Sequence, residues 1–411
     1  MILRVILSFL ILFPSICSFS QVRTLDYFLR AGLSNSPLIK DLNNQVRMNS
    51  VDSLLAHATR LPQVKYNGFM MYSPTINNWG YSEAITNGGN LISTLNVSQN
   101  LFNKKTIEAQ YSKIGLVTQS VKNTIRISEK DLKKIITDQY LSAYSLSSEI
   151  DFKKILLKSA YNEESILKQM VENGVYHQTD YLSFLLELQL IDMDLNDLQI
   201  QFQKELSTLK LYCGISDTVS FELVLPEISK SAIITGNSPF FDQFRIDSLK
   251  LLNEKTLIDR SYKPAVNWMS DAGLVNNDPS VIYKNLGLSL GMSLTLPVYD
   301  GNQRKLNYTK LKLSEETRKG YKDFFSQQYD QQVHQLNIEL RRTQDVIPKL
   351  EQQLKVAESI IKLDRDLLNN GGITITDFVI AVKNLVTFKQ NLIQYQVKAL
   401  RIINEINYWE E

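Results

Sequence analysis

Hydrophobic positions along the chain follow two different periods. From Lys104 to Glu172 apolar residues recur every three or four positions, the spacing of a packed seam on an α-helix. Proline is absent between Pro74 and Pro226. A helix of about 69 residues, rising roughly 1.5 Å per residue, would reach about 100 Å. The pattern therefore predicts one long helix over 104–172, in a helical hairpin or coiled coil.

A glycine turn is predicted where this helix ends. Asn173-Gly174 supplies a left-handed stop, and Thr179-Asp180 is expected to cap a return helix over 178–212. The second half repeats these features, with a long helix over 303–369, a stop at Asn370-Gly371-Gly372 and a return helix over 376–408. Two similar helical hairpins are therefore expected.

Pro348 lies inside the second long helix. A proline at this position removes one backbone donor and crowds the preceding turn. We therefore expect a kink there, or a change in what the helix packs against.

Before each long helix, the period changes from helical to two. The clearest strand alternates Gly, Ser and Thr with the aliphatic residues Leu286, Leu288, Leu290, Met292, Leu294 and Leu296. Hairpins are predicted over 64–100 and 265–297, each preceded by a short helix. Strands of about 9–11 residues with one apolar and one polar face are typical of a transmembrane barrel. Soluble hairpins with one face on a core give the same alternation.

The barrel is favoured because the apolar positions of the helices are expected to pack against other helices. This leaves no obvious second layer to cover the strands. Four strands cannot close a barrel, however, and an open edge in lipid would leave backbone groups unpaired. Several copies of the chain must then share one barrel. The pattern predicts a homo-oligomer.

Matching segments recur with a period of about 200 residues, which indicates a duplicated half-molecule rather than a solenoid. The pairs are Ser36-Pro37 with Ser238-Pro239, Leu61-Pro62 with Lys263-Pro264, and Thr179-Asp180 with Thr376-Asp377. We expect a first repeat over 21–212, a linker over 213–237 and a second repeat over 238–411.

The amino terminus predicts export. Arg4 precedes an apolar run and then small residues, as in a secretory signal over 1–20 that is cleaved before Gln21. Cys213 is then the only thiol, so no internal disulfide is expected. No later apolar stretch is long enough for a spanning helix. A net charge of +2 argues against a nucleic-acid partner.

The strand exits carry a family resemblance. They read Val97-Ser98-Gln99-Asn100-Leu101-Phe102 and Leu294-Thr295-Leu296-Pro297-Val298-Tyr299-Asp300-Gly301. With the signal segment, the duplicated halves and the Leu61-Pro62-Gln63-Val64 strand start, the chain resembles the TolC family of outer-membrane efflux and secretion channels. It departs from the family at Asn100, where a proline is usual, and at Asn103-Lys104, where Asp-Gly is usual.

The resemblance implies a fold that is mainly α with β, in which long antiparallel helical hairpins form a periplasmic α-barrel. It implies a homotrimer whose chains each give four strands to one β-barrel in the outer membrane. It also implies a periplasmic adaptor and an inner-membrane pump as partners. The chain would then be the exit duct of a tripartite efflux or type I secretion system, gated where the helical hairpins close the tunnel.

The candidate gate follows from this resemblance and from the glycine turns. Its residues are Asp180, Asp377, Asn173, Gly174, Asn370, Gly371 and Gly372. In an oligomer Asp180 and Asp377 would form carboxylate rings that attract cations. Each aspartate also suits the first turn of its helix, where it stabilises the helix dipole. Ile380 stands where some family members carry a second acidic residue, so a double acidic gate is not expected.

No catalytic chemistry is expected. His57, His177 and His334 have no second ligand one turn away, so no metal site is predicted. Phosphate-loop and hydrolase motifs are absent, and no cofactor is expected. The alternative to a channel is a periplasmic coiled-coil scaffold or adaptor without a pore. In that protein the aliphatic face of 286–296 would be buried by protein, whereas in a channel it would face lipid.

Overall fold

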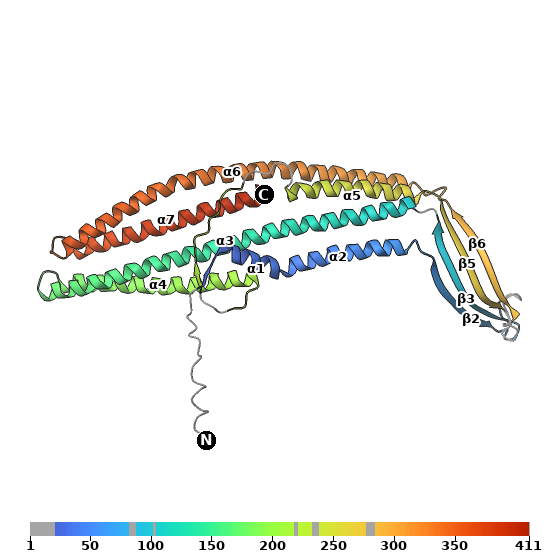
Figure 1. The fold of residues 1–411 in the computed structure, drawn as a ribbon, viewed down its shortest axis with the longest axis horizontal. Helices are drawn as coiled ribbons and strands as arrows, with labels where there is room; N and C mark the ends of the chain where they lie inside the picture. Colours follow the sequence, from blue (N-terminus) through green and yellow to red (C-terminus); the bar gives the residue numbers. More distant parts are fainter. Residues whose placement is uncertain are drawn as a thin grey trace, which may run out of the picture. The chain divides into compact units, whose positions relative to one another are not determined.

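A computed structural model describes residues 21–81, 88–101, 104–217, 221–231, 238–276 and 284–410 (Figure 1). The predicted signal segment over 1–20 lies outside these ranges. The chain passes twice through the order short helix, β-hairpin, long helix and return helix. The first pass comprises α1 (Leu25–Asn35), α2 (Pro37–Ala58), β2 (Gln63–Ser73), β3 (Gly88–Leu101), α3 (Lys104–Glu172) and α4 (Gln178–Cys213). The second comprises α5 (Pro239–Ser261), β5 (Ala265–Asn276), β6 (Leu286–Thr295), α6 (Gln303–Leu368) and α7 (Ile375–Glu410).

The chain divides into two compact units. One, the sheet unit, contains residues 37–128 and 235–330, and the other, the helical unit, contains the remaining described residues. Each unit contains elements from both passes of the chain. Helices α3 and α6 each have residues in both units.

In the sheet unit, four antiparallel strands lie in the order β2-β3-β5-β6. Their registers place Tyr66 opposite Leu95, Leu95 opposite Ala272 and Ala272 opposite Leu288. Residues directly opposite one another share a face of a sheet. The apolar alternations of the four strands therefore fall on one face.

Helix α5 is held between the two long helices. The side chain of Asn253 donates to the backbone oxygen of Ala109 on α3, at 3.1 Å, and is itself buried. On its other side, α5 packs aromatic rings against α6, with Phe241 and Phe325 5.3 Å apart. A buried amide hydrogen bond and edge-to-face ring contacts specify this packing more narrowly than aliphatic contact alone.

In the helical unit, two short paired strands connect the first described residues to the predicted linker over 213–237. Strand β1 (Gln21–Arg23) pairs in parallel with β4 (Phe221–Leu223). Beneath them, Phe28, Tyr140 and Phe221 form a core, and the Tyr140 hydroxyl donates to the backbone oxygen of Val224 at 2.7 Å. Cys213 is buried in this core, and burial raises the pKa of its thiol to about 12. The thiol is therefore not a nucleophile at neutral pH.

Helix α6 continues through Pro348, and its packing changes there. Before the proline, Leu336 and Leu340 pack on α7. After it, the cluster around Leu350 also takes in Phe152 and Leu156 of α3. The change of packing partner expected at Pro348 is therefore present.

Candidate functional site

The first glycine turn is a helix stop closed by two backbone bonds. Gly174 has φ +76°, and its N–H donates to the carbonyl of Val171 at 3.0 Å. The N–H of Val175 donates to the carbonyl of Met170 at 2.9 Å. This pair of bonds defines a Schellman motif, in which the left-handed residue is usually glycine.

The second turn repeats the first. Gly371 has φ +71°, its N–H bonds to the carbonyl of Leu368, and the N–H of Gly372 bonds to that of Leu367 at 2.8 Å. Asn173 and Asn370 each precede the left-handed glycine. The residues singled out in the two turns are therefore matching positions of one motif.

Tyr176 ties the two turns together. Its hydroxyl lies 2.8 Å from the carbonyl oxygen of Leu368 and 2.9 Å from that of Ile373. Burial raises the pKa of this hydroxyl, so it is a permanent donor at neutral pH. Sequence reasoning missed Tyr176 because its partners lie 192 and 197 positions away. No local pattern marks such a contact.

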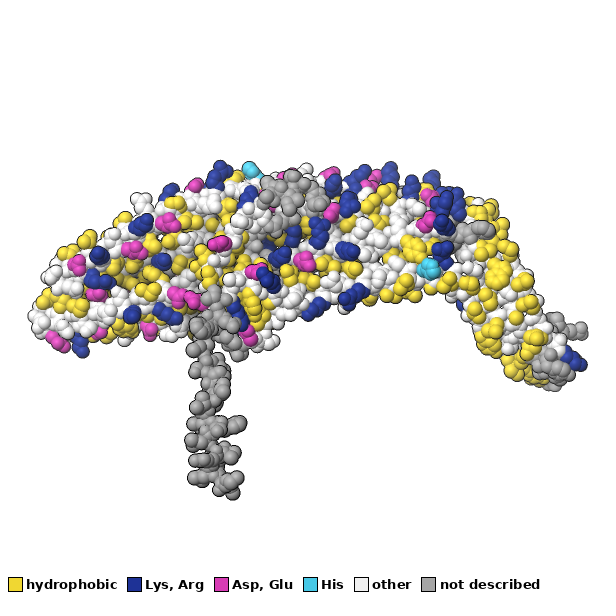
Figure 2. Space-filling model, in the orientation of Figure 1, with side chains coloured by type: hydrophobic (Ala, Val, Ile, Leu, Met, Phe, Trp, Pro, Cys, Tyr) yellow, Lys and Arg dark blue, Asp and Glu magenta, His cyan; other side chains and the backbone are white. Residues whose placement is uncertain are grey.

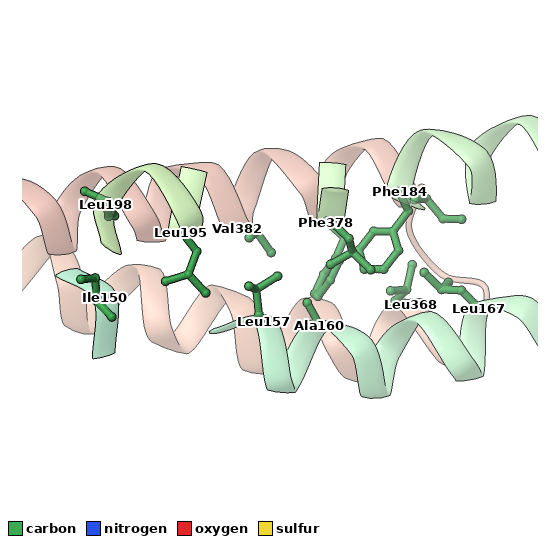
Figure 3. Packing of buried hydrophobic residues seen from close by; sticks show 12 residues of the cluster. Ile150, Leu157, Ala160, Leu167, Phe184, Leu195, Leu198, Leu368, Phe378 and Val382 are labelled. Carbon is green, nitrogen blue, oxygen red and sulfur yellow. The ribbon is translucent and has the colours of Figure 1, made fainter. Parts of the chain in front are cut away.

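Below the turns, α3, α4, α6 and α7 meet around one apolar cluster. Figure 3 shows Phe184 of α4 beside Phe378 of α7, and their ring centroids are 6.3 Å apart. Leu167 and Leu368, close to the ends of α3 and α6, are fully buried in this cluster. The two hairpins therefore share a core near their turns.

Ion pairs also join the hairpins. Arg365 of α6 lies 2.6 Å from the carboxylate of Glu163 on α3, and Lys383 of α7 lies 2.9 Å from Glu187 on α4. Burial raises the pKa of Glu163, and the charge of Arg365 opposes that shift. Buried charges that depend on a partner in the other hairpin favour one relative position of the two.

The two aspartates differ in their surroundings. The backbone N–H of Asp377 donates to the hydroxyl oxygen of Thr374 at 3.1 Å, and that hydroxyl donates to the Asp377 carboxylate at 2.7 Å. Thr374 therefore caps α7, and the exposed Asp377 completes the cap. Asp377 also lines a groove of about 670 Å³ between α6 and α7, beside Asp364 and Ile380.

The predicted cap at Thr179-Asp180 is wrong in one respect. Helix α4 begins at Gln178, and His177 occupies the N-cap position without a side-chain bond. Thr179 is therefore the second residue of the helix, and Asp180 is the third. A third-position carboxylate still interacts favourably with the helix dipole. The rings that Asp180 and Asp377 would form require several chains, so they stay a prediction.

The sheet carries the second candidate site, its apolar face. The five predicted residues within β6, Leu286 to Leu294, are 67–75% exposed, and Leu296 follows the end of the strand. Val64, Tyr66 and Met70 of β2 share the face and are also exposed. Figure 2 shows hydrophobic side chains gathered over the strands. No described part of the chain covers this face.

The opposite face mixes polar side chains with apolar ones, which are Phe69, Met71, Ile92, Met269 and Val275. A polar row on this face crosses all four strands. The registers align Lys65, Asn96, Asp271 and Ser289. Ser289 donates to the Asp271 carboxylate at 2.5 Å. The outer strands β2 and β6 each have one neighbour, so each presents an open edge.

Among the described helices, none combines the length and the apolarity needed to cross a bilayer. The described residues also contain no cluster of three or more His, Cys, Asp or Glu side chains suited to a metal ion.

No family model and no curated protein matches this sequence. Solved structures match along nearly all of it. VceC, an outer membrane protein of Vibrio cholerae, matches with TM-score 0.75 and 14% identity over 94% of this chain and 96% of that chain. The MtrE outer membrane channel of Neisseria gonorrhoeae, in its open state, matches with TM-score 0.73 and 11% identity over 94% and 88%. The CmeC outer membrane channel of Campylobacter jejuni matches with TM-score 0.72 and 13% identity over 94% and 86%.

This chain has the fold of those outer-membrane proteins. The predicted fold class, long antiparallel helical hairpins with four strands per chain, is confirmed. At 11–14% identity the likeness concerns the fold, and function has to be argued from the turns and the sheet.

Proposed function

We propose that the chain is one subunit of a homotrimeric channel in the bacterial outer membrane, extending into the periplasm. The observation that carries this proposal is the four-stranded sheet with one exposed apolar face and two open edges. Pairing β6 of one copy with β2 of the next removes every open edge when the ring closes. Three copies would give twelve strands, with the apolar face toward lipid and the face that carries Lys65, Asp271 and Ser289 toward a pore.

The trimer would serve as the exit duct of a tripartite efflux or type I secretion system. It would meet a periplasmic adaptor and an inner-membrane pump at the helical end. The two turns are the natural contact for the adaptor, because they combine exposed polar residues with a rigid backbone. In this role the chain performs no covalent chemistry. Residues 1–20 would be the export signal.

Opening would be a relative movement of the hairpins at their turns. The contacts that must part include those of Tyr176 with the second turn, the pair Arg365–Glu163 and the packing of Phe184 on Phe378. Water can replace the polar contacts when the hairpins separate, whereas the apolar packing must shift. Cargo would then move through the pore by diffusion, with energy supplied by the pump.

The first test is the native mass of the protein after detergent extraction from separated outer membranes. We expect a stable trimer that conducts ions in planar bilayers. A monomer or dimer recovered from the soluble periplasm would contradict the channel and leave the coiled-coil scaffold as the function to pursue.

A further inference from the structure

A band of positive charge surrounds one end of the sheet. We define the basic band as residues 57–63, 104–107, 258–265 and 296–306, where the helices of the sheet unit join the strands. All four strands begin or end beside it. Its lysines and arginines are Arg60, Lys104, Lys105, Arg260, Lys263, Arg304 and Lys305, and its acidic residues are Asp259 and Asp300. Figure 2 shows Lys and Arg gathered at this junction.

The charge of the band is unusual for this chain. Seven cations against two carboxylates exceed the net charge of +2 carried by all 411 residues. The band is therefore a local excess, balanced by acidic residues elsewhere. A concentrated patch of one sign indicates a partner of the other sign.

Both carboxylates of the band are already engaged within it. Asp259 lies 2.5 Å from the guanidinium of Arg304 and also bonds to the hydroxyl of Tyr308. Asp300 accepts the backbone N–H groups of Asn302 and Arg304, at 2.9 and 2.8 Å. These bonds order the start of α6. The exposed lysines of the band, Lys104, Lys105, Lys263 and Lys305, lie outside those bonds.

Apolar side chains accompany the charge. Val298 and Tyr299, between β6 and α6, are 92% and 86% exposed. They follow directly on the alternating leucines of β6, so the apolar face of the sheet continues into the basic band. Apolar and aromatic residues beside Lys and Arg are typical of the boundary between hydrocarbon and head groups.

We propose that the basic band binds the head groups of anionic phospholipids, at the level where the sheet leaves the membrane. This inference rests on the proposed channel, because it places the apolar face of the sheet in lipid. A phospholipid can contact both the lysines and the apolar side chains of the band. Its phosphate would pair with the lysines, and its acyl chains would pack against Leu296 and Val298. A soluble acidic partner would leave those apolar side chains in water.

The test is lipid retention by the purified full-length trimer. The protein is incubated with equal amounts of phosphatidylglycerol and phosphatidylcholine in detergent, and retained lipids are counted by native mass spectrometry. We expect at least about a threefold preference for phosphatidylglycerol in 0.1 M salt, falling toward parity in 0.5 M salt because the attraction is screened. Equal retention of the two lipids in low salt would overturn the inference.

A matched pair of variants locates the effect. The triple substitution Lys104→Gln, Lys105→Gln and Lys263→Gln should remove most of the preference. The control triple Lys154→Gln, Lys158→Gln and Lys168→Gln removes the same charge from exposed positions on α3 in the helical unit and should keep it. Loss of the preference in the control alone would assign lipid binding to the helices and refute the band.

The two proposals fail in different ways. A wild-type protein that is not a trimer and retains neither lipid would contradict the channel itself. A trimer that conducts ions but does not distinguish the lipids would contradict only the basic band. If the triple variant does not assemble, the single substitution Lys263→Gln, at an exposed position of the band, takes its place and should lower the preference.

Discussion

Gly273 is the residue whose identity the sheet fixes most tightly. A Cβ built on it would lie 2.1 Å from the backbone oxygen of Ser93 and 2.6 Å from the Cα of Thr94. These atoms belong to strand β3, so relieving the clash means moving a backbone. The sequence shows only a glycine within an alternating strand, and such a glycine often marks a close backbone approach.

We expect Gly273→Ala to destabilise the sheet by about 1–3 kcal/mol, the usual cost of overpacking. The measurement is thermal unfolding of the detergent-solubilised protein. Gly287→Ala is the matched control, because Gly287 lies directly opposite Gly273 and has no atoms within 4 Å of its Cβ position. Equal effects of the two substitutions would show that glycine itself, rather than the close approach, matters here.

Tyr176 is the residue that links the two turns. Tyr176→Phe keeps the ring and removes the hydroxyl, which should weaken the closed arrangement by about 1 kcal/mol. We expect more frequent openings in planar-bilayer recordings. Tyr161→Phe on α3, at a half-exposed tyrosine, is the control. Unchanged opening in Tyr176→Phe would mean that the hydroxyl plays no part in closure.

Among the elements, the pairing of β1 with β4 is expected to contribute a stability that depends on pH. Arg23 lies 2.7 Å from the carboxylate of Asp217, and that hydrogen bond lowers the pKa of Asp217 from its ordinary 3.8. A carboxyl group whose pKa is lower in the folded protein stabilises it above the unfolded pKa. This contribution is lost as the pH falls through the folded pKa, below 3.8.

We therefore expect Asp217→Asn to lower the melting temperature at pH 7 and to have progressively less effect below pH 4. Circular dichroism of the helices in detergent measures this. Asp192→Asn, at an exposed position on α4, should have little effect at either pH. A destabilisation by Asp217→Asn that persists undiminished at acid pH would argue against the ion pair.

The polar face of the sheet makes a prediction about ion selectivity. Lys65 and Asp271 are the charged members of the row that crosses the strands, so a three-copy pore would carry both signs at one level. Asp271→Asn should shift the reversal potential toward anion selectivity, and Lys65→Gln should shift it toward cation selectivity. Asn67→Ser, on the same face, should leave it unchanged. No shift in either charge variant would place these residues outside the pore.

For the whole molecule, the decisive question is which face of the sheet meets lipid. Leu290→Arg places a charge on the apolar face and should cost about 2–4 kcal/mol if that face lies at the middle of the bilayer. Ser293→Arg places the same charge on the opposite face of the same strand and should be tolerated. The measurement is the fraction of protein recovered as trimer from outer membranes. Equal recovery of the two variants would contradict a lipid-facing β6.

Local patterns predicted the elements of this fold because each pattern reflects a local period. The three-to-four spacing gave α3, and the alternation from Leu286 to Leu294 gave β6. Asn-Gly pairs marked both turns, since only a residue tolerant of positive φ ends a helix in this way. The helix caps were harder to predict, because the repeat pairs Thr179-Asp180 with Thr376-Asp377, whereas the cap of α7 is Thr374. The residue that corresponds to Thr374 before α4 is His177, which makes no side-chain cap bond.

By itself, the sequence determined the helices, the strands, the turns and the two-sided character of the sheet. The tertiary structure decided which faces coincide, because a slip of one residue in any strand pair would turn its apolar side to the other face. It also decided the contacts of Tyr176, Arg365 and Gly273, whose partners are distant in sequence. Those contacts depend on how whole helices and strands pack, and no period along the chain records that.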